Sequence, residues 1–179
     1  MLPMKVFIIT GNRGEGKTTF LKKCVGELQR RNLALFGFYA NNVKTTTGSE
    51  GYLIKNVTTL DSRLLCQRDI PSNMDDLHLA DFWFDKRAIE TGEQWLKEGF
   101  SNNSPVFILD EVGKFELDGY VWDKSINHLL RFEKGVLLMT VRDRFLQRVM
   151  EKYRLDKTNC SVIDSLLFTV ELVDEIERG

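Results

Sequence analysis

A glycine-rich octapeptide near the amino terminus constrains the possible folds of this chain more than any other feature. It reads Gly11-Asn-Arg-Gly-Glu-Gly-Lys-Thr18 and matches the pattern G-x-x-x-x-G-K-[ST]. In such a loop, glycines let the backbone curl until successive amide groups point inward and hold an anion. The helix that follows adds its positive end to the same site. The octapeptide therefore predicts a phosphate-binding P-loop.

The positions of this loop have different expected roles. Lys17 is predicted to reach the β- and γ-phosphates as a catalytic cation, and the Thr18 hydroxyl to bind Mg²⁺. Glu15 is expected to point outward to solvent, because a carboxylate would repel phosphate. The predicted nucleotide-binding residues are Gly11, Asn12, Arg13, Gly14, Glu15, Gly16, Lys17, Thr18 and Thr19.

The segments around the loop predict the class of fold. Apolar, β-branched residues at 5–10 indicate a buried strand, and a pattern of helical period follows over 17–31. A second strand is expected over 33–39. This order is a βαβ unit, which predicts an α/β protein of three layers with a mostly parallel central sheet. We expect one P-loop domain over residues 1–179.

Beyond the second strand the patterns are shorter. A small antiparallel hairpin is expected, with strands at 51–57 and 63–67 and a flexible polar tip at 41–51. Residues 69–80 give no clear signal. The remaining expected elements are helices at 86–99, 121–132 and 145–153 and strands at 105–110, 135–141 and 166–170.

Two carboxylates follow the apolar strand at 105–110. Asp110 is expected at the tip of a strand beside the phosphate-binding strand, where it would hold Mg²⁺. Glu111 would be the general base that polarises the attacking water. Arg142, at the end of a later strand, is the predicted cation for the charge that develops on the γ-phosphate. The alternatives for that cation are Arg144, Lys114 and Arg13.

A competing interpretation concerns the same acidic segment. Asp110-Glu-Val-Gly113 spells D-x-x-G, which in GTPase switches senses the γ-phosphate through its glycine. The Asn-Lys-x-Asp sequence that usually selects guanine is absent from the chain. A switch specific for GTP is therefore the weaker hypothesis.

Composition excludes several other classes of protein. The formal net charge is −1, whereas a general nucleic-acid binder should carry a basic excess, so no DNA partner is expected. No apolar run approaches the roughly 18 residues that span a bilayer, and the apolar start at 5–10 is too short for a signal peptide. We expect a cytoplasmic protein without a membrane partner.

The cysteines and histidines show no metal-binding pattern. The three cysteines are far apart in the chain and fit neither a zinc nor a disulfide framework. His78 and His128 lack metal-ligand spacing and are expected to be structural or exposed. The aromatic run at 82–84 is expected to pack in the core, with stacking on a nucleotide base as the alternative.

Several blocks together resemble a known family. They are Thr10 to Thr19, Gly37-Phe-Tyr39, Gly51-Tyr-Leu-Ile54, Leu109-Asp-Glu-Val-Gly-Lys-Phe-Glu-Leu117 and Met139-Thr-Val-Arg142. Their order and spacing are similar to those of the small nucleoside-triphosphatase family with human cancer-related and thermophile members. The resemblance spans about residues 5–170. It implies a RecA-like P-loop fold and slow, Mg²⁺-dependent hydrolysis of ATP, GTP and other triphosphates with loose base selectivity.

The resemblance also assigns roles and shows departures. It implies that Lys17 and Thr18 bind phosphate and Mg²⁺, and that Asp110 and Glu111 serve the metal and the water. The family often has a proline in the phosphate loop, and Thr-Val-His where this chain has Thr140-Val-Arg142. Residues 69–85 match no part of the family pattern.

The predicted function is therefore a nucleoside triphosphatase with Mg²⁺ as cofactor and a nucleoside triphosphate as substrate. A small-molecule kinase is one alternative, since it would use the same site with a hydroxyl acceptor in a second pocket. A slow nucleotide-dependent regulatory module with a protein partner is another.

Overall fold

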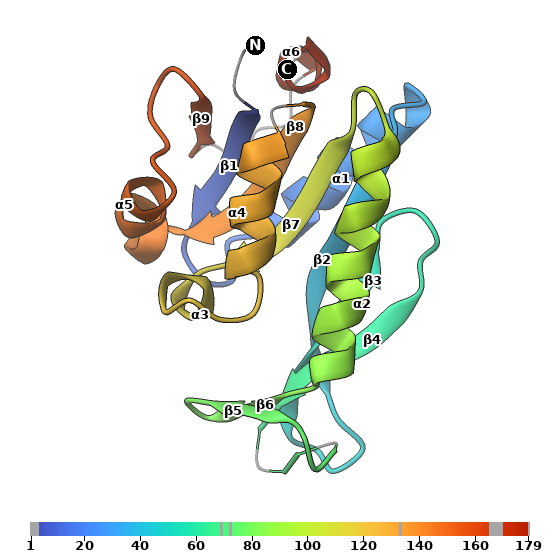
Figure 1. Cartoon of the computed structure of the whole chain (residues 1–179), viewed down its shortest axis with the longest axis vertical. Helices are drawn as coiled ribbons and strands as arrows, with labels where there is room; N and C mark the ends of the chain where they lie inside the picture. The colour runs from blue at the N-terminus through green and yellow to red at the C-terminus, as the bar shows by residue number, and fades with distance from the viewer. Residues whose placement is uncertain (1–3, 69, 72, 133, 165–169, 179) are drawn as a thin grey trace.

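One sheet runs through the whole molecule. The computed structural model describes residues 4–68, 70–71, 73–132, 134–164 and 170–178. In these residues the strand order is β5-β6-β4-β3-β2-β7-β8-β1-β9 (Figure 1). The strands are β1 (Lys5–Gly11), β2 (Leu35–Lys44), β3 (Glu50–Asn56), β4 (Ser62–Gln67), β5 (Leu77–Leu79), β6 (Phe82–Phe84), β7 (Val106–Val112), β8 (Val136–Arg142) and β9 (Cys160–Ile163).

The helices join these strands as crossovers or flank them. They are α1 (Lys17–Arg30), α2 (Lys86–Lys97), α3 (Lys114–Leu117), α4 (Asp123–Phe132), α5 (Asp143–Lys152) and α6 (Val170–Arg178), with a 3₁₀ turn η1 (Glu98–Ser101). None of the described helices is both long enough and apolar enough to cross a membrane.

The sheet is mixed, with a parallel half and an antiparallel half. Strands β2, β7, β8, β1 and β9 pair in parallel. Strands β2, β3, β4, β6 and β5 pair antiparallel. The α/β class is confirmed, but the expectation of a mostly parallel sheet is wrong. Where the sequence indicated a small hairpin, the antiparallel part is an arm that includes the short strands β5 and β6, below the rest of the sheet in Figure 1.

The strand order places β8 between the P-loop strand and the acidic strand. Strand β8 pairs with β1 on one side and with β7 on the other. The expectation that β7 would lie directly beside β1 is therefore wrong. Because β1 and β8 run in register, Gly11 is opposite Arg142 at the carboxyl end of the sheet.

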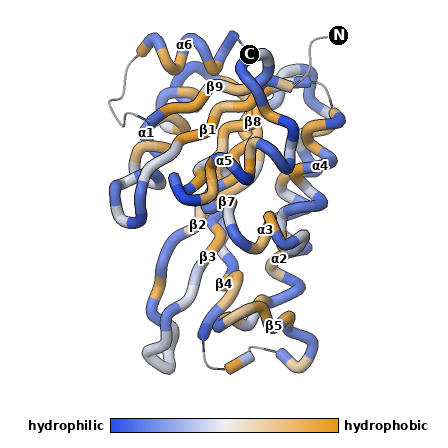
Figure 2. The backbone as a smooth tube through the Cα atoms, turned by 90° about the vertical axis from the view of Figure 1, so that its left-hand side faces the viewer, coloured by the Kyte–Doolittle hydropathy of each residue, from blue (hydrophilic) through white to orange (hydrophobic). Residues whose placement is uncertain are grey.

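Helices cover both faces of the parallel strands. On one face, α1 and α6 contribute Leu21, Leu28 and Ile176 to a core cluster with Ile9 and other buried residues of the sheet. Helices α2, α4 and α5 lie over the opposite face, where they pack on a second cluster. The central strands β1, β7 and β8 are consequently buried on both sides and read as continuous hydrophobic segments (Figure 2).

Several element boundaries differ from the expectation. Strand β2 continues to Lys44, five residues past the expected end, so the polar tip shrinks to the turn between β2 and β3. The strands and helices expected from 86 to 153 are confirmed within a few residues. The sequence patterns missed β5, β6, β9, α3 and α6. Most of the strand expected at 166–170 lies outside the described residues, and Val170 is the first residue of α6.

One glycine permits the close packing of the acidic strand. Gly37 in β2 has φ +113°, and a Cβ atom there would lie 2.1 Å from the carbonyl oxygen of Ile108 in β7. Any side chain at this position would push the two strands apart. Gly37 therefore keeps β2 close to β7, immediately before the segment that carries the acidic residues.

Candidate active site

The loop between β1 and α1 has the backbone of a phosphate-binding turn. Gly14 and Gly16 have φ values of 83° and 89°, a left-handed conformation that favours glycine. The Lys17 side chain is only 5% exposed. Its ammonium donates to the carbonyl oxygens of Gly11 at 3.0 Å and Asn12 at 2.6 Å. The loop thus holds the lysine folded against its own backbone.

Glu15 is exposed, in agreement with the prediction, but its carboxylate is not free. Oε2 accepts from the backbone N–H of Asn12 at 2.6 Å, and Oε1 accepts from the Asn12 side-chain amide at 3.0 Å. These bonds tie the first half of the loop to the residue before Gly16. The carboxylate therefore stabilises the loop conformation.

Asp110 is the most highly bonded side chain of the site. Oδ2 accepts from the Thr18 hydroxyl at 2.9 Å and from the backbone N–H of Ala40 at 3.0 Å. Oδ1 accepts from the Thr140 hydroxyl at 2.6 Å. The donors come from α1, β2 and β8, so one carboxylate connects three elements that meet at this end of the sheet.

Burial changes the acidity of this carboxylate. Asp110 is 1% exposed, and desolvation raises its pKa to about 6, although the bonds from Thr140 and Ala40 oppose that shift. A cation close to Asp110 would favour the charged form and lower the pKa again.

A break in strand pairing sets Glu111 apart from Asp110. The β7–β8 register shifts between Leu109 and Val112, and Glu111 has φ +64°. Its backbone N–H donates to the Thr140 hydroxyl oxygen at 2.8 Å, which secures this unfavourable conformation. A bulge of this kind redirects a side chain. As a result Asp110 is buried, while the Glu111 side chain remains 30% exposed and lines the loop pocket.

Arg142 is adjacent to Glu111. Its guanidinium lies 3.1 Å from Glu111 Oε2, and both side chains line a pocket of about 300 Å³ that also includes Lys17 and Thr18. Burial lowers the pKa of Arg142, but the Glu111 carboxylate and Tyr52 together raise it more, so the net shift is upward. The arginine is therefore a permanent cation at the edge of the P-loop.

The other candidate cations lie farther out. Arg13 lines the loop pocket but pairs with Glu50 at 3.0 Å and is 65% exposed. The guanidinium of Arg144 lies over the Phe145 ring, 4.5 Å from its centroid. Arg144 and Lys114 line a neighbouring cavity, not the loop pocket. Of these four cations, only Arg142 both lines the loop pocket and forms an ion pair with Glu111, the predicted base.

The oxygen donors of Thr18 and Asp110 suit a magnesium ion. Mg²⁺ prefers oxygen ligands and is usually held by one or two protein groups together with water and substrate phosphates. No group of three or more His, Cys, Asp or Glu side chains forms a metal cage among the described residues. The hydroxyl and carboxylate at 2.9 Å fit the shared type of site, in which the nucleotide supplies further ligands.

The glycine of the D-x-x-G segment is already engaged. The backbone N–H of Gly113 donates to Glu116 Oε2 at 2.8 Å, and Glu116 is buried. In a GTPase switch this N–H would be available to the γ-phosphate. The observed bond therefore weakens the switch interpretation.

The remaining candidate residues are the two histidines and the three cysteines. His78 stacks on Trp83 with ring centroids 4.2 Å apart, and His128 lies 4.5 Å from the Phe100 ring. The three cysteines, Cys24, Cys66 and Cys160, are buried free thiols.

Two Asp110 partners were missed by sequence reasoning. Thr140 is fully buried and contacts both acidic residues, and the Ala40 contact is a backbone amide. A threonine in an otherwise apolar strand, Val-Leu-Leu-Met-Thr140-Val, is a signal that could have indicated the first. No side chain signals the second.

A family model and curated relatives match this chain. The model, described as NTPase, matches residues 6–166. The nucleoside-triphosphatase THEP1 of Thermotoga petrophila is 26% identical over 185 residues, covering 98% of this chain and 96% of the relative. That of Saccharolobus solfataricus is 27% identical over 142 residues, covering 78% and 77%.

Solved structures share the fold. The crystal structure of THEP1 from Aquifex aeolicus matches with a TM-score of 0.67 and 22% identity, over 96% of each chain. The solution structure of a human cancer-related nucleoside triphosphatase matches with a TM-score of 0.68 and 18% identity, over 97% of this chain and 95% of that one. The chain therefore shares its overall α/β fold with these two proteins.

Proposed function

This chain belongs to the NTPase family and is a nucleoside triphosphatase, and we propose that it cleaves the γ-phosphate of ATP, GTP and other triphosphates in a Mg²⁺-dependent reaction with loose base selectivity. The observation that carries the proposal is the contact between the P-loop and the acidic strand. Thr18 and Asp110 meet at 2.9 Å although 92 positions separate them in the chain.

The P-loop, residues 11–19, is the proposed phosphate-binding element. The backbone amides of the turn and the start of α1 would hold the polyphosphate, and the Lys17 ammonium would exchange its carbonyl partners for β- and γ-phosphate oxygens. Thr18 and Asp110 would hold Mg²⁺. When bound, that ion neutralises negative charge on the phosphates.

Glu111 is the proposed general base. Its carboxylate accepts a proton from water as the water oxygen bonds to the γ-phosphorus and the bond to the β–γ bridging oxygen breaks. Arg142 holds this carboxylate at 3.1 Å and offers its remaining N–H groups to the γ-phosphate. The proposed general base, Glu111, and the proposed γ-phosphate cation, Arg142, are thus the two members of one ion pair.

The wider setting is also part of the proposal. The order β9-β1-β8-β7-β2, with a strand between the P-loop strand and the acidic strand, supports a RecA-like, three-layer arrangement. The single continuous sheet supports one domain over residues 1–179. Three buried free thiols are compatible with the reducing environment of the cytoplasm.

A phosphate-release screen tests this function. Purified protein is assayed with ATP, GTP, CTP and UTP, each with Mg²⁺ and with excess chelator. We expect release from all four triphosphates that stops when the metal is removed. Release that persists without a divalent cation, or that is confined to one base, would contradict the proposal.

A further inference from the structure

A second cavity adjoins the P-loop pocket at Glu111. Its volume is about 320 Å³, at the lower end of the roughly 300–1,000 Å³ typical of small-molecule sites. The two pockets share five lining residues, which are Arg13, Ala40, Tyr52, Glu111 and Arg142. A molecule in the second cavity would therefore lie beside the position of the γ-phosphate.

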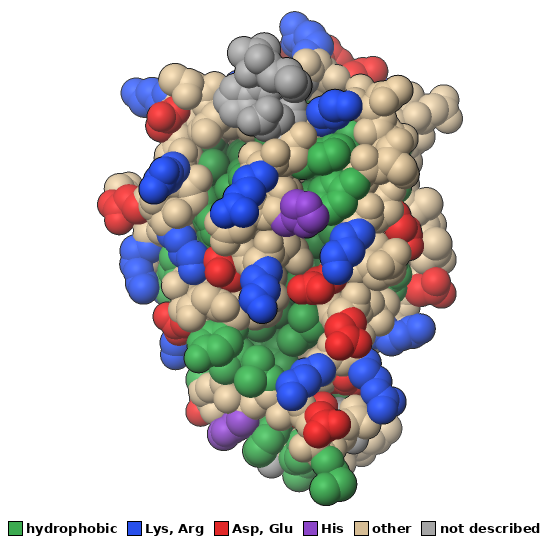
Figure 3. Space-filling model, in the orientation of Figure 1, with side chains coloured by type: hydrophobic (Ala, Val, Ile, Leu, Met, Phe, Trp, Pro, Cys, Tyr) green, Lys and Arg blue, Asp and Glu red, His purple; other side chains and the backbone are tan. Residues whose placement is uncertain are grey.

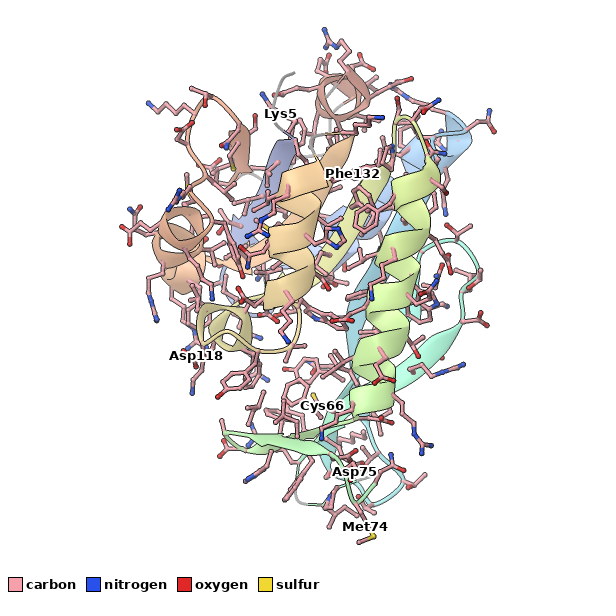
Figure 4. All side chains as sticks on the ribbon, viewed as in Figure 1. Lys5, Cys66, Met74, Asp75, Asp118 and Phe132 are labelled. Carbon is pink, nitrogen blue, oxygen red and sulfur yellow. The ribbon has the colours of Figure 1, made fainter. Side chains whose placement is uncertain are left out.

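The walls of this cavity are rich in aromatic rings, and we call it the aromatic cavity. Its rings come from the antiparallel arm on one side and from the α3 to α5 region on the other. They are Tyr52, Phe82, Phe84, Phe115, Trp122 and Phe145. Figure 3 shows hydrophobic side chains gathered on the front face between α3 and the β5–β6 hairpin, and Figure 4 shows Cys66, another lining residue, in the same region.

The rings contact one another but keep accessible surface. Tyr52 meets Phe82 edge-on at 5.7 Å, and Phe84 meets Phe115 edge-on at 4.8 Å between centroids. Tyr52, Phe82, Phe115 and Phe145 are only partly buried. Partly exposed rings around a hollow can stack on a flat ligand, which fully packed core rings cannot.

The charged lining complements the rings. Arg68 is occupied by Glu50 at 3.0 Å and Asp81 at 3.2 Å. Lys114 and Arg144 have no carboxylate partner within 4.0 Å among the described residues, the range over which ion pairs form. The lining thus contains unpaired cations as well as the Glu111 carboxylate, which favours a ligand that also carries hydroxyl groups.

We propose that the aromatic cavity binds a nucleoside as a second substrate, with the base against the rings and a sugar hydroxyl directed at Glu111. The proposal rests on the proposed role of Glu111 as the base. The hydroxyl oxygen bonds to the γ-phosphorus, the bond to the β–γ bridging oxygen breaks, and the nucleoside diphosphate leaves with that electron pair. Glu111 takes the hydroxyl proton. The products are a phosphorylated nucleoside and a nucleoside diphosphate.

Binding is tested first, apart from catalysis. Saturation-transfer NMR is recorded with adenosine, guanosine, cytidine, uridine and thymidine at millimolar concentration, with and without a saturating non-hydrolysable ATP analogue and Mg²⁺. We expect at least one nucleoside to bind in both conditions. Absence of binding by all five, or binding that the analogue abolishes, overturns the proposal.

Variants locate the bound nucleoside. Phe82→Ala and Phe145→Ala remove rings from opposite walls, and each should weaken binding about fivefold or more. Tyr120→Ala removes an aromatic side chain that is 46% exposed and lies outside the cavity lining, so it should change nothing. Folding of each variant is checked by thermal melting. Unchanged binding in both wall variants overturns the assignment.

Transfer is tested with ATP labelled at the γ-phosphate. The label should appear in the bound nucleoside, and Phe145→Ala should lose this transfer while its phosphate release without nucleoside stays within about threefold of wild type. Binding without any transfer refutes the acceptor role. Lys17→Ala should still bind the nucleoside, so failure of the P-loop assignment and failure of the cavity assignment give different results.

Discussion

The side chains of Thr18 and Asp110 meet with 2.9 Å between the hydroxyl oxygen and Oδ2. This contact joins the start of α1 to the end of β7. Asp110 also accepts from Ala40 and Thr140, so losing Thr18 leaves its other bonds in place. The Thr18 hydroxyl can therefore be removed without releasing the carboxylate from the sheet.

Thr18→Ala should raise the Mg²⁺ concentration needed for half-maximal phosphate release. The lost oxygen is a proposed metal ligand, and a hydrogen bond to a charged group corresponds to roughly a 10- to 100-fold effect. Thr18→Ser keeps the hydroxyl and should remain near wild type. A Mg²⁺ titration of both variants measures this, and equal half-saturation values would remove Thr18 from the metal site.

Lys17→Ala should abolish detectable phosphate release. The ammonium is the cation that the P-loop directs at the phosphates, and no other lysine occupies the loop. Lys23→Ala, an exposed lysine on the same helix, is the matched control and should retain wild-type release. Turnover in Lys17→Ala comparable to that of the control would end the P-loop assignment.

Local sequence was sufficient to predict the glycine turn between β1 and α1, because its glycines and Lys17 lie within eight residues. It also indicated Asp110 and Glu111, since acids at the end of an apolar strand are a short-range pattern. The position of β8 between β1 and β7 is a property of tertiary pairing, and the expectation placed the acidic strand wrongly for that reason. The left-handed backbone at Glu111 depends on the Thr140 hydroxyl from that same strand.

The antiparallel arm shows another limit of sequence reasoning. Strands β5 and β6 have three residues each, too short for alternation to appear. The arm is secured by ion pairs from Arg68 to Glu50 and Asp81, which lie 18 and 13 positions away in the chain. Such pairings follow from the folded arrangement of the strands, so the aromatic run at 82–84 was a local signal only for rings, and the cavity that Phe82 and Phe84 line depends on tertiary structure.

Glu111→Gln should bind nucleotide normally and hydrolyse it far more slowly. A carboxamide cannot accept the proton of the attacking water, and loss of a general base costs about 10²- to 10⁴-fold in rate. Nucleotide affinity should stay within about threefold of wild type, because the phosphate ligands are unchanged. Single-turnover hydrolysis together with equilibrium binding measures both quantities. A rate near wild type would place the base elsewhere.

Arg142 should act through the ion pair with Glu111. Arg142→Ala should lower kcat about tenfold or more, and a loss under about threefold would leave it a surface residue. In the double variant with Glu111→Gln, we expect a rate loss smaller than the product of the two single effects, because residues in contact are not additive. A double variant slowed by the product of the two single effects would show that the arginine works independently of the base.

Glu116 should make the stability of the protein depend on pH. Burial raises the pKa of Glu116 to about 7 from the ordinary 4.5, although backbone bonds from Gly113 and Trp122 oppose the shift. The folded state therefore binds more protons than the unfolded chain between these pH values, so stability falls as pH rises from about 4.5 to about 7. The decrease attributable to this residue is at most ~3 kcal/mol.

Glu116→Gln isolates that contribution. The amide oxygen can still accept from the Gly113 N–H at the 2.8 Å position, but the side chain no longer titrates. Asp110, whose pKa is about 6, titrates in wild type and variant alike. The difference between wild type and variant in how the free energy of unfolding changes with pH is therefore due to Glu116. We expect the variant to gain stability relative to wild type between pH 5 and pH 8, measured by urea unfolding. Glu151→Gln, on an exposed face of α5, is the matched control for the change from Glu to Gln. If the free energy of unfolding changes with pH in the same way for Glu116→Gln and wild type, Glu116 stays ionised in the folded protein. Its charge would then be stabilised by the amides of the 113–122 segment.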